Sequence, residues 1–416
     1  MVNIIAKFDL AIIGGGIIGL AIARRVSIKH PKLRICVLEK ERELASHQSK
    51  RNSGVVHCGI YYKKFSLKSR FCIRGAELVK NYCLEKGLPY HQCGKLIIAT
   101  DEEEVATLRK LHDNAIVSGI QGVQLLTPGQ VGRVQPECTN VMEAIWSPNT
   151  AIVDWQKVAL SYADDFRRND GTIYTQFIVD GILDGGHSLH LKKAGVDDFI
   201  GAKSVINCAG LSSDFFPLTT GNKYHPKIVP FKGRYYLLDQ KLAKSIKTNI
   251  YPVPNPKLPF LGVHITPRID GSVLIGPTAL PSLGYYNYKP DDELFLKQIY
   301  LIFIASGLFR MLKNRDFRKA GLLELRQYLS KEFFTKGVRK LLPNIKPEDL
   351  IQTDFCGIRA QAIGSDGELI DDFYYETGLR PQFSRVLHLR NCPSPAATSS
   401  LAIAERIVKV LEERLI

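Results

Sequence analysis

The chain has 416 residues, and its 45% hydrophobic and 23% charged content is ordinary for a globular protein. The nine cysteines are an odd number without C-x-x-C or Cys/His ligand spacing, which argues against structural disulfides and a zinc site and indicates a reducing compartment. The net charge of +15 is unusual, and no apolar run approaches the roughly 18 residues that a membrane-spanning helix needs.

The N-terminal segment has the pattern of a dinucleotide-binding unit. Residues 8–13 form a short apolar run typical of a buried parallel strand, and they lead into Gly14, Gly16 and Gly19. This G-x-G-x-x-G spacing permits a tight turn, close approach of the backbone to a pyrophosphate, and close packing of the next helix on the strand. The N-terminus of that helix presents free N–H groups and the positive end of its dipole to phosphates.

A second strand, at residues 33–38, ends in Glu39, whose carboxylate can accept hydrogen bonds from ribose hydroxyls. Three glycines alone often mark only a Gly-rich turn. The strand, helix, second strand and acid in register favour an adenine dinucleotide. Because the first strand starts at residue 8, we expect either that the chain needs no targeting leader or that a leader is absent from this sequence.

The next part of the chain alternates helices and strands and then returns to the nucleotide unit. The patterns predict a helix at 66–86, a strand at 95–100, an acidic helix from 101, an extended stretch at 141–152, a helix at 155–169, a strand at 172–182 and a polar hairpin near 185–186. The buried run 204–210 ends in Ala209 and Gly210, small residues that let a ligand approach the backbone. We interpret it as a further strand of the nucleotide sheet.

The remaining half differs in character. Residues 226–290 have a β pattern punctuated by Pro and Gly, which indicates a mostly antiparallel sheet over which a substrate could lie. A helical, basic stretch follows at 291–345, then short strands at 355–359 and 386–389 and a helix at 398–411. The expected fold is α/β, a discontinuous Rossmann-like nucleotide domain (1–88, 151–225 and 351–416) beside an antiparallel substrate domain (89–150 and 226–350).

More than half of the net charge lies between Lys297 and Lys340, where eleven Lys and Arg stand against Asp316, Glu324 and Glu332, a net +8. Leu, Phe and Ile are interleaved with these charges. The segment is either a solvated charged face or a surface that docks on anionic lipid headgroups. Nucleic acid is not an expected partner, because no recognised nucleic-acid-binding module accompanies the charge.

Two segments could border a redox ring. The turn Asn52, Ser53 and Gly54 is followed by His57 and by Tyr61 and Tyr62, and such side chains suit close approach to a flat ring, although a lone His is more often structural. Near the C-terminus, a proline-stiffened loop at 390–400 places Ser394, Thr398 and Ser399 at a helix N-terminus. That terminus would stabilise negative charge on a reduced flavin; a simple capped helix is the alternative.

Arg359 follows a short strand, and a guanidinium there can clamp a carboxylate bidentately. A surface ion pair is the alternative role for this residue. Lys232, Tyr235 and His264 lie in the β-rich middle and could complete an anion pocket.

Taken together, several motifs resemble those of the glycine-oxidase and D-amino-acid-oxidase class of flavoproteins and, within it, the L-2-hydroxyglutarate dehydrogenase family. They are GGGIIGLAIAR, LEKE, NSGVVHCGIYYK, CGKLIIAT, GIRAQAI and RNCPSPAATSSLAIA, and the resemblance extends over nearly the whole chain. It implies bound FAD and a carboxylate-bearing 2-hydroxy acid. The residues expected at FAD are Gly14, Gly16, Gly19, Glu39, Lys40, Asn52, Ser53, Gly54, Val179, Ala209, Gly210, Ser394, Thr398 and Ser399.

The resemblance implies oxidation of L-2-hydroxyglutarate to 2-oxoglutarate, with hydride passing from C2 to flavin N5. His57 would remove the hydroxyl proton, and Arg359 would bind a carboxylate with help from Lys232 or His264. The expected substrate site also includes Tyr62 and Tyr235. FAD is expected to bind without a covalent link. If a covalent link existed, Cys58 would be the candidate residue for it.

The implied partners are a small dicarboxylate, a membrane electron acceptor such as a quinone or an electron-transfer flavoprotein, and an anionic membrane surface. The implied location is mitochondrial and peripheral to the membrane, or the cytoplasmic face of a bacterial membrane. Residues 301–340 diverge from the family and are more cationic. Two alternatives stay open: another flavin oxidase of the class acting on an amino acid or glycerol 3-phosphate, and a flavin-binding regulatory module with a basic docking surface.

Overall fold

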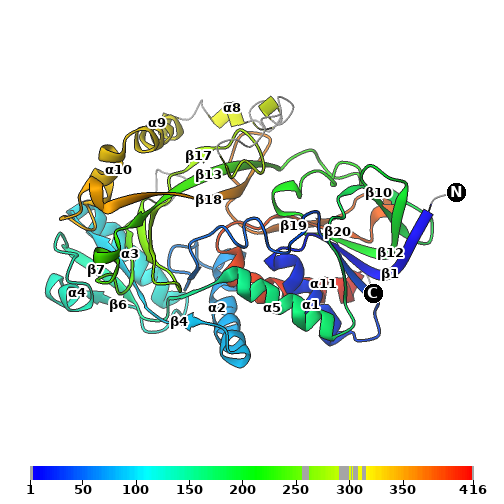
Figure 1. The fold of residues 1–416 in the computed structure, drawn as a ribbon, viewed down its shortest axis with the longest axis horizontal. Coiled ribbons are helices and arrows are strands. Elements are labelled where there is room, and N and C mark those ends of the chain that lie inside the picture. Colours follow the sequence, from blue (N-terminus) through cyan, green and yellow to red (C-terminus); the bar gives the residue numbers. More distant parts are fainter. Residues whose placement is uncertain are drawn as a thin grey trace.

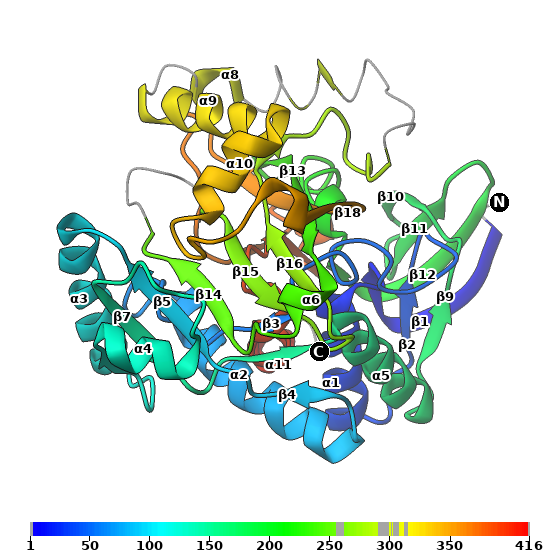
Figure 2. The same cartoon turned by 60° about the vertical axis from the view of Figure 1, so that its left-hand side comes forward.

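The computed structural model describes residues 3–254, 262–289, 299–300, 302, 308–311 and 315–414. Two large sheets lie side by side, the first with the chain termini near it and the second beneath the helices at the top of both views (Figure 1, Figure 2). Neither sheet is built from one continuous segment, because the chain crosses between them several times.

The first sheet is mainly parallel at its centre, where β1 pairs in parallel with both β2 and β12, β2 with β9, and β12 with β20. Its antiparallel additions are β10–β11 on one side and β19 beside β20. The strands are β1 (Asn3–Ile13), β2 (Ile35–Leu38), β9 (Thr172–Tyr174), β10 (Val179–Asp184), β11 (Leu189–Lys193), β12 (Asp198–Asn207), β19 (Tyr374–Thr377) and β20 (Val386–Asn391).

Helices α1 (Ile17–Lys29), α5 (Trp155–Arg168), α11 (Ala396–Arg414) and α2 (Leu67–Lys86) pack in one layer against this sheet, with α1 between α5 and α11 (Figure 1). Their apolar side chains form the largest core cluster together with those of β1 and β2. The helix α2 crosses α11 closely, because a Cβ on Gly75 would lie 2.3 Å from the carbonyl oxygen of Thr398. This crossing fixes the N-terminus of α11 relative to the strands.

The second sheet is mixed and long, in the order β17-β13-β16-β15-β14-β5-β7-β6, with β18 on the other side of β13. The strands are β5 (Lys95–Ala99), β6 (Gln124–Leu126), β7 (Glu143–Ser147), β13 (Lys227–Leu238), β14 (Asn249–Pro252), β15 (His264–Pro267), β16 (Val273–Gly276), β17 (Leu280–Pro281) and β18 (Leu350–Ile363). All pairings are antiparallel except that of β14 with β5. The expectation of a mostly antiparallel second sheet is confirmed.

Short elements connect and cover these sheets. A small sheet joins β3 (Val55–Val56), β4 (Tyr90–His91) and β8 (Ala151–Val153). Within the residues that the structure describes, the remaining α-helices are α3 (Glu102–Val117), α4 (Pro128–Val134), α6 (Gln240–Ala243), α8 (Leu308–Met311), α9 (Arg315–Leu329) and α10 (Lys331–Val338). Helices α8, α9 and α10 lie over the second sheet, away from the first (Figure 2).

The structure modifies two expectations from the sequence. The predicted strand at 172–182 is two strands, β9 and β10, because the chain turns at 175–178, where Gln176 has φ +54. The expected third segment of the nucleotide domain starts at residue 351, inside β18, which pairs with β13 of the second sheet from Leu350 to Ile363. A division into nucleotide and substrate domains therefore places this boundary after Ile363, and the division itself stays a proposal.

Candidate active site

The glycine loop lies at the carboxyl end of β1 and is too tight for side chains. Gly14 has φ +108, and a Cβ there would lie 2.4 Å from the carbonyl oxygen of Cys208 at the end of β12. A Cβ on Gly19 would lie 2.1 Å from the carbonyl oxygen of Gly14. The helix α1 therefore begins at Ile17, with Gly16 as its N-cap, directly against two strand ends, the geometry that admits a pyrophosphate to a helix N-terminus.

Glu39 follows β2 and lies beside this loop. Its carboxylate accepts hydrogen bonds from the backbone N–H of Gly15 at 2.6 Å and of Glu41 at 2.9 Å. Burial raises the pKa of this carboxyl, and the two N–H donors oppose that rise. The backbone of Phe177 hydrogen-bonds to Glu39, so the start of β10 at Val179 runs along the same edge. This edge matches the ribose and adenine side of a dinucleotide.

The segment after Glu39 is held by its own polar side chains. Ser49 Oγ accepts a hydrogen bond from Ile17 N at 2.9 Å, in the first turn of α1. Asn52 accepts from Gly54 N at 2.9 Å and donates to the carbonyls of Gln48 and Ser49, so Asn52 shapes the turn that contains Ser53. Gly54 has φ +82, which favours glycine.

Lys40 and Lys232 are engaged with the segment 285–288. Lys40 Nζ lies 3.1 Å from the centroid of the Tyr286 ring and 3.1 Å from Glu41 Oε1. Lys232 Nζ donates to the carbonyl of Asn287 at 2.6 Å. The structure therefore groups Lys232 with this aromatic segment rather than with Arg359.

The N-terminus of α11 approaches the same region from the other side. Thr398 Oγ1 accepts a hydrogen bond from His57 N at 3.1 Å, which ties the first turn of α11 to the His57 loop. Ser399 Oγ is buried, and within the described part of the chain it has no hydrogen-bond partner. Ala209 donates to Asn207 Oδ1 at 3.1 Å, Gly210 has φ +57, and Ser394 is exposed in the loop before the helix.

These observations fit FAD. A glycine cradle that excludes side chains, a carboxylate after β2, and two helix N-termini with an unpartnered buried hydroxyl form one continuous set. Cys58 Sγ lies 3.3 Å from Thr150 Oγ1 within an apolar cluster, which agrees with the prediction of a non-covalent cofactor without testing it.

Beyond His57 lies a buried group of polar side chains, here called the Lys95 cluster: His57, Tyr61, Lys95, Tyr251, His264 and Thr266. The rings of Tyr251 and His264 stack with centroids 4.1 Å apart, and those of Tyr61 and Tyr251 are 6.3 Å apart. Lys95 Nζ lies 4.7 Å from the Tyr61 ring centroid and 5.2 Å from that of Tyr251.

Burial sets the protonation of this cluster. It lowers the pKa of His57 to about 3, with further lowering by Lys95 and His264. It lowers the pKa of His264 to about 4. Both imidazoles are therefore neutral at neutral pH, and the His57 ring, which has no hydrogen-bond partner among the described residues, can accept a proton.

Arg359 lies on β18 opposite Phe231 of β13, and its neighbours are Tyr62, Lys68 and Asp371. Burial lowers the pKa of Arg359, while Asp371 and Tyr62 oppose that shift. Because neighbouring residues on a strand point to opposite faces, Lys232, next to Phe231, points away from Arg359. The structure does not bring Lys232 to the side of Arg359, and the expected help of Lys232 or His264 at the carboxylate stays a prediction.

Tyr62 connects Arg359 to the Lys95 cluster. Burial raises the pKa of the Tyr62 phenol, and both Tyr251 and Arg359 influence it. His264 belongs to the cluster that Tyr62 borders, and its expected role at the substrate stays a prediction. Tyr235 is nearby but separate: its ring packs 5.5 Å from Phe355 and lies beside Gly276, the strand partner of His264.

Sequence reasoning missed Lys95, Tyr251 and Thr266; it placed Tyr61 only at the edge of the redox ring. The available signal was a lysine directly before the apolar run LIIA of a predicted strand, in CGKLIIAT. Lysine is almost never fully buried without a partner, so a lysine in such a strand indicates a partner or a ligand for its ammonium group.

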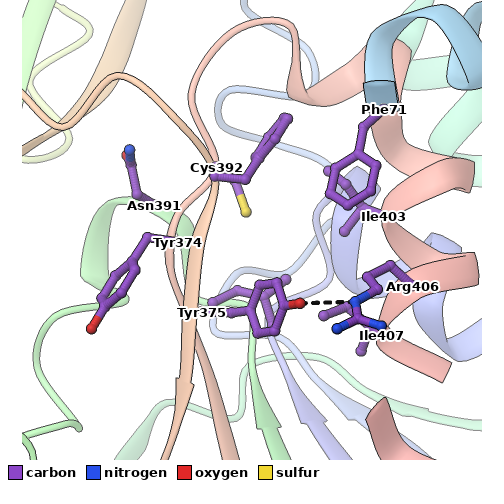
Figure 3. Close-up of a pocket in the computed structure, with 10 residues that line it drawn as sticks. Phe71, Tyr374, Tyr375, Asn391, Cys392, Ile403, Arg406 and Ile407 are labelled. Carbon is purple, nitrogen blue, oxygen red and sulfur yellow. Dashed lines mark hydrogen bonds between the residues drawn. The ribbon is translucent and has the colours of Figure 1, made fainter. Parts of the chain in front are cut away.

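A separate small pocket of about 10 Å³ lies between β20, β19, α2 and α11, lined by Phe71, Tyr375, Ile403 and Ile407 among others (Figure 3). Tyr375 accepts a hydrogen bond from Arg406 Nε at 2.9 Å at its edge. Its size is close to that of one water molecule, and none of the expected catalytic residues lines it.

Comparisons with known proteins agree with this geometry. The model of a family described as "FAD dependent oxidoreductase" matches residues 9–410. L-2-hydroxyglutarate dehydrogenase, mitochondrial, from Nematostella vectensis is 42% identical over 98% of this chain and 91% of its own length. The human protein of the same name is 41% identical over 98% of this chain and 89% of its own length.

Solved structures share the fold. L-α-glycerophosphate oxidase from Mycoplasma pneumoniae, with FAD bound, superposes with a TM-score of 0.78 at 21% identity, covering 98% of this chain and 95% of that one. Glycine oxidase from Geobacillus kaustophilus superposes with a TM-score of 0.70 at 18% identity, covering 99% and 96%. The fold class expected from the sequence is confirmed.

Proposed function

Since the chain belongs to the FAD-dependent oxidoreductases, and within them to the L-2-hydroxyglutarate dehydrogenase family, we propose that it oxidises L-2-hydroxyglutarate to 2-oxoglutarate. The observation that carries this proposal is the buried, neutral His57 beside the FAD-binding elements, with the basic side chain of Lys95 near it and that of Arg359 near the adjacent Tyr62. A hydroxy acid with two carboxylates matches one base and two cations.

FAD, held by the glycine loop, Glu39 and the α11 N-terminus, supplies the two-electron acceptor when bound. Arg359 binds and orients one carboxylate through its planar fork. His57 accepts the hydroxyl proton at a ring nitrogen, and Thr398 holds the His57 backbone in place through its hydrogen bond. The buried aromatic rings of the cluster exclude water from the reacting carbon.

We also propose that the basic helices lie on an anionic membrane surface and deliver electrons to a membrane acceptor. On α9 the exposed leucines Leu322, Leu325 and Leu329 lie at helical spacing on one stripe, flanked by Lys319 and Arg326. An exposed apolar stripe between cations is the composition of an interfacial helix. In the described ranges, no helix is both long and apolar enough to cross a bilayer.

The names of the curated relatives include "mitochondrial", and we propose the same location here, peripheral to a membrane. A quinone or an electron-transfer flavoprotein would serve as acceptor. Parts of the basic segment, including Lys297 and Lys313, lie outside the described residues.

The test is anaerobic reduction of the bound flavin by candidate substrates. L-2-hydroxyglutarate should bleach the flavin, while L-α-glycerophosphate and glycine, substrates suggested by the structural neighbours, should not. If L-α-glycerophosphate or glycine bleached the flavin at a comparable rate, oxidation of that compound would replace the proposed activity.

A further inference from the structure

Lys95 occupies an exceptional position for a lysine. It is the first residue of β5, in register with Asn249 of β14 and Ser147 of β7, in the middle of the second sheet. Its side chain points to the same face as Ile97, whose partner on β14 is Tyr251. Only 1% of Lys95 is accessible to solvent.

Within the described residues, Lys95 Nζ has neither a carboxylate nor a hydrogen-bond acceptor. Other shielded lysines in this molecule are paired: Lys68 with Asp371 at 2.5 Å and Lys86 with Asp165 at 2.8 Å. A buried ammonium without a counter-charge is costly, because its lost hydration is not replaced. The aromatic rings of Tyr61 and Tyr251 compensate for part of this cost through cation–π contact.

The surroundings of Lys95 point to a missing acceptor rather than to a missing donor. The hydroxyl oxygens of Tyr61, Tyr251 and Thr266 are all buried, and none has a hydrogen-bond partner among the described residues. Thr266 lies beside the Tyr251 hydroxyl and opposes the rise that burial causes in the pKa of Tyr251. An ammonium and three hydroxyls can all donate to a single acceptor.

The charge of the cluster selects an anion. No Asp or Glu belongs to it, and Lys95 lowers the pKa of both His57 and His264. Burial also lowers the pKa of Lys95. A carboxylate placed against Lys95 would replace its lost hydration and favour its charged form.

The position of the cluster relates this anion to the reaction. Lys95 is near His57, the proposed base, whereas Arg359 lies beyond Tyr62, which both Arg359 and Tyr251 reach electrostatically. A short diacid whose hydroxyl faces His57 would therefore have Arg359 at one end and Lys95 at the other.

We propose that Lys95, together with the hydroxyls of Tyr61, Tyr251 and Thr266, binds the second carboxylate of the substrate and sets the preference of the enzyme for a dicarboxylate. This inference rests on the proposed function, because it assigns the far end of the same substrate. Lys95 is thus a specificity-determining residue, and Arg359 and His57 retain their roles in binding and proton removal.

The experiment compares L-2-hydroxyglutarate with its 5-amide, which keeps the reacting end and the shape but lacks the second charge. With FAD-loaded protein, the parent should prefer the diacid in kcat/KM of flavin reduction. Lys95→Met should lower that preference by between about 30-fold and about 5,000-fold, the range for truncating one partner of a buried charge pair. The loss should appear mainly in KM for the diacid, and kcat/KM for the amide should fall much less than kcat/KM for the diacid.

Stability separates this role from a structural one. Lys95→Met removes an unpaired buried charge and should raise the melting temperature of the ligand-free holoenzyme. The matched control Lys86→Met leaves Asp165 without one of its cations, and should lower the melting temperature while the diacid preference stays at the parent value. If Lys95→Met does not fold, Tyr251→Phe and Thr266→Val, which delete one hydroxyl each, should lower the preference by about 10- to 100-fold.

Binding of glutarate and butyrate, followed by perturbation of the flavin spectrum, distinguishes the two proposals. If L-2-hydroxyglutarate does not reduce the flavin but glutarate binds far better than butyrate, and only with Lys95 present, the anion site stands and the proposed substrate fails. If the flavin is reduced and Lys95→Met, or the two hydroxyl variants, keep the full preference for the diacid, the role of Lys95 is overturned.

Discussion

The nucleotide end and the substrate end of this molecule satisfy their buried polar groups in opposite ways. At the nucleotide end, the side chains of Glu39, Ser49 and Asn52 are already hydrogen-bonded to backbone N–H groups. At the substrate end, Lys95 and the hydroxyls around it have no such partners in the described residues. The first region is thus preorganised by its own backbone, and the second requires a polar ligand to complete it.

The difference has an energetic consequence. Changes at the nucleotide end disturb a structure that the chain builds for itself, so they should affect both cofactor content and folding. Changes at the substrate end remove groups that are costly in the ligand-free protein, so they should affect affinity and rate while leaving the fold intact or more stable.

The largest effect is expected at the glycine loop. In Gly19→Ala the new Cβ would meet the carbonyl oxygen of Gly14, a backbone atom that cannot move without displacing the loop. The purified variant should carry no FAD, measured by absorbance after extraction. Gly129→Ala is the matched control, because its Cβ has nothing within 4 Å; normal FAD content in both variants would contradict the proposed cradle.

Removal of the proposed base should slow flavin reduction without loss of bound FAD. His57→Gln should retain FAD but slow flavin reduction by about 10²–10⁴-fold, the contribution typical of a general base. Stopped-flow reduction measures this directly. A rate within a few-fold of the parent would make His57 a structural residue.

The same measurement across pH sharpens this assignment. Because burial lowers the pKa of His57 to about 3, the imidazole is neutral at neutral pH and loses its basic form only as pH falls toward that value. The parent should show no limb in kcat/KM near the ordinary pKa of histidine. A bound dianion favours the protonated ring, so the limb in kcat should lie at higher pH than the limb in kcat/KM.

Arg359→Lys should have a smaller effect, because the charge remains and only the planar fork is lost. We expect KM for the substrate to rise by about 10- to 100-fold, the loss of one charged hydrogen bond, with FAD content unchanged. An unchanged KM would place Arg359 in a structural interaction with its neighbour Asp371.

The basic helix should matter least for the chemistry. Reversing Arg315, Lys319 and Arg326 to Glu should abolish co-sedimentation with anionic liposomes and leave flavin reduction by substrate intact. In the parent, co-sedimentation should fall with added salt.

The control carries the same charge change elsewhere, at the exposed Lys32, Lys110 and Lys157. It should keep most of the liposome binding. If both variants lost liposome binding equally, net charge alone would explain the binding, and the α9 stripe would have no specific role.

The same contrast between the two ends explains which parts of the site could be predicted from the sequence. The glycine loop, Glu39 and the α11 N-terminus are encoded locally, since strand, turn and helix are adjacent in the chain and their geometry follows from spacing. The Lys95 cluster is assembled from the 57–61 loop and strands β5, β14 and β15, which no local pattern brings together.

The expectations that differ from the pairing of strands have a common physical cause. Lys232 or His264 was expected to help Arg359 bind a carboxylate, but the register of β13 with β18 directs Lys232 and Arg359 to opposite faces. The expected domain boundary at residue 351 falls inside β18, whose partner β13 lies far away in the sequence. Pairing partners, unlike element types, are not determined by a single strand.

The most direct test of the whole account is the absorption spectrum of the FAD-loaded protein before and after anaerobic addition of L-2-hydroxyglutarate. The account predicts complete bleaching of the visible flavin band with formation of 2-oxoglutarate in equal amount, and no bleaching by D-2-hydroxyglutarate. A flavin that stays oxidised with the L-isomer, or that both isomers reduce equally well, would contradict it.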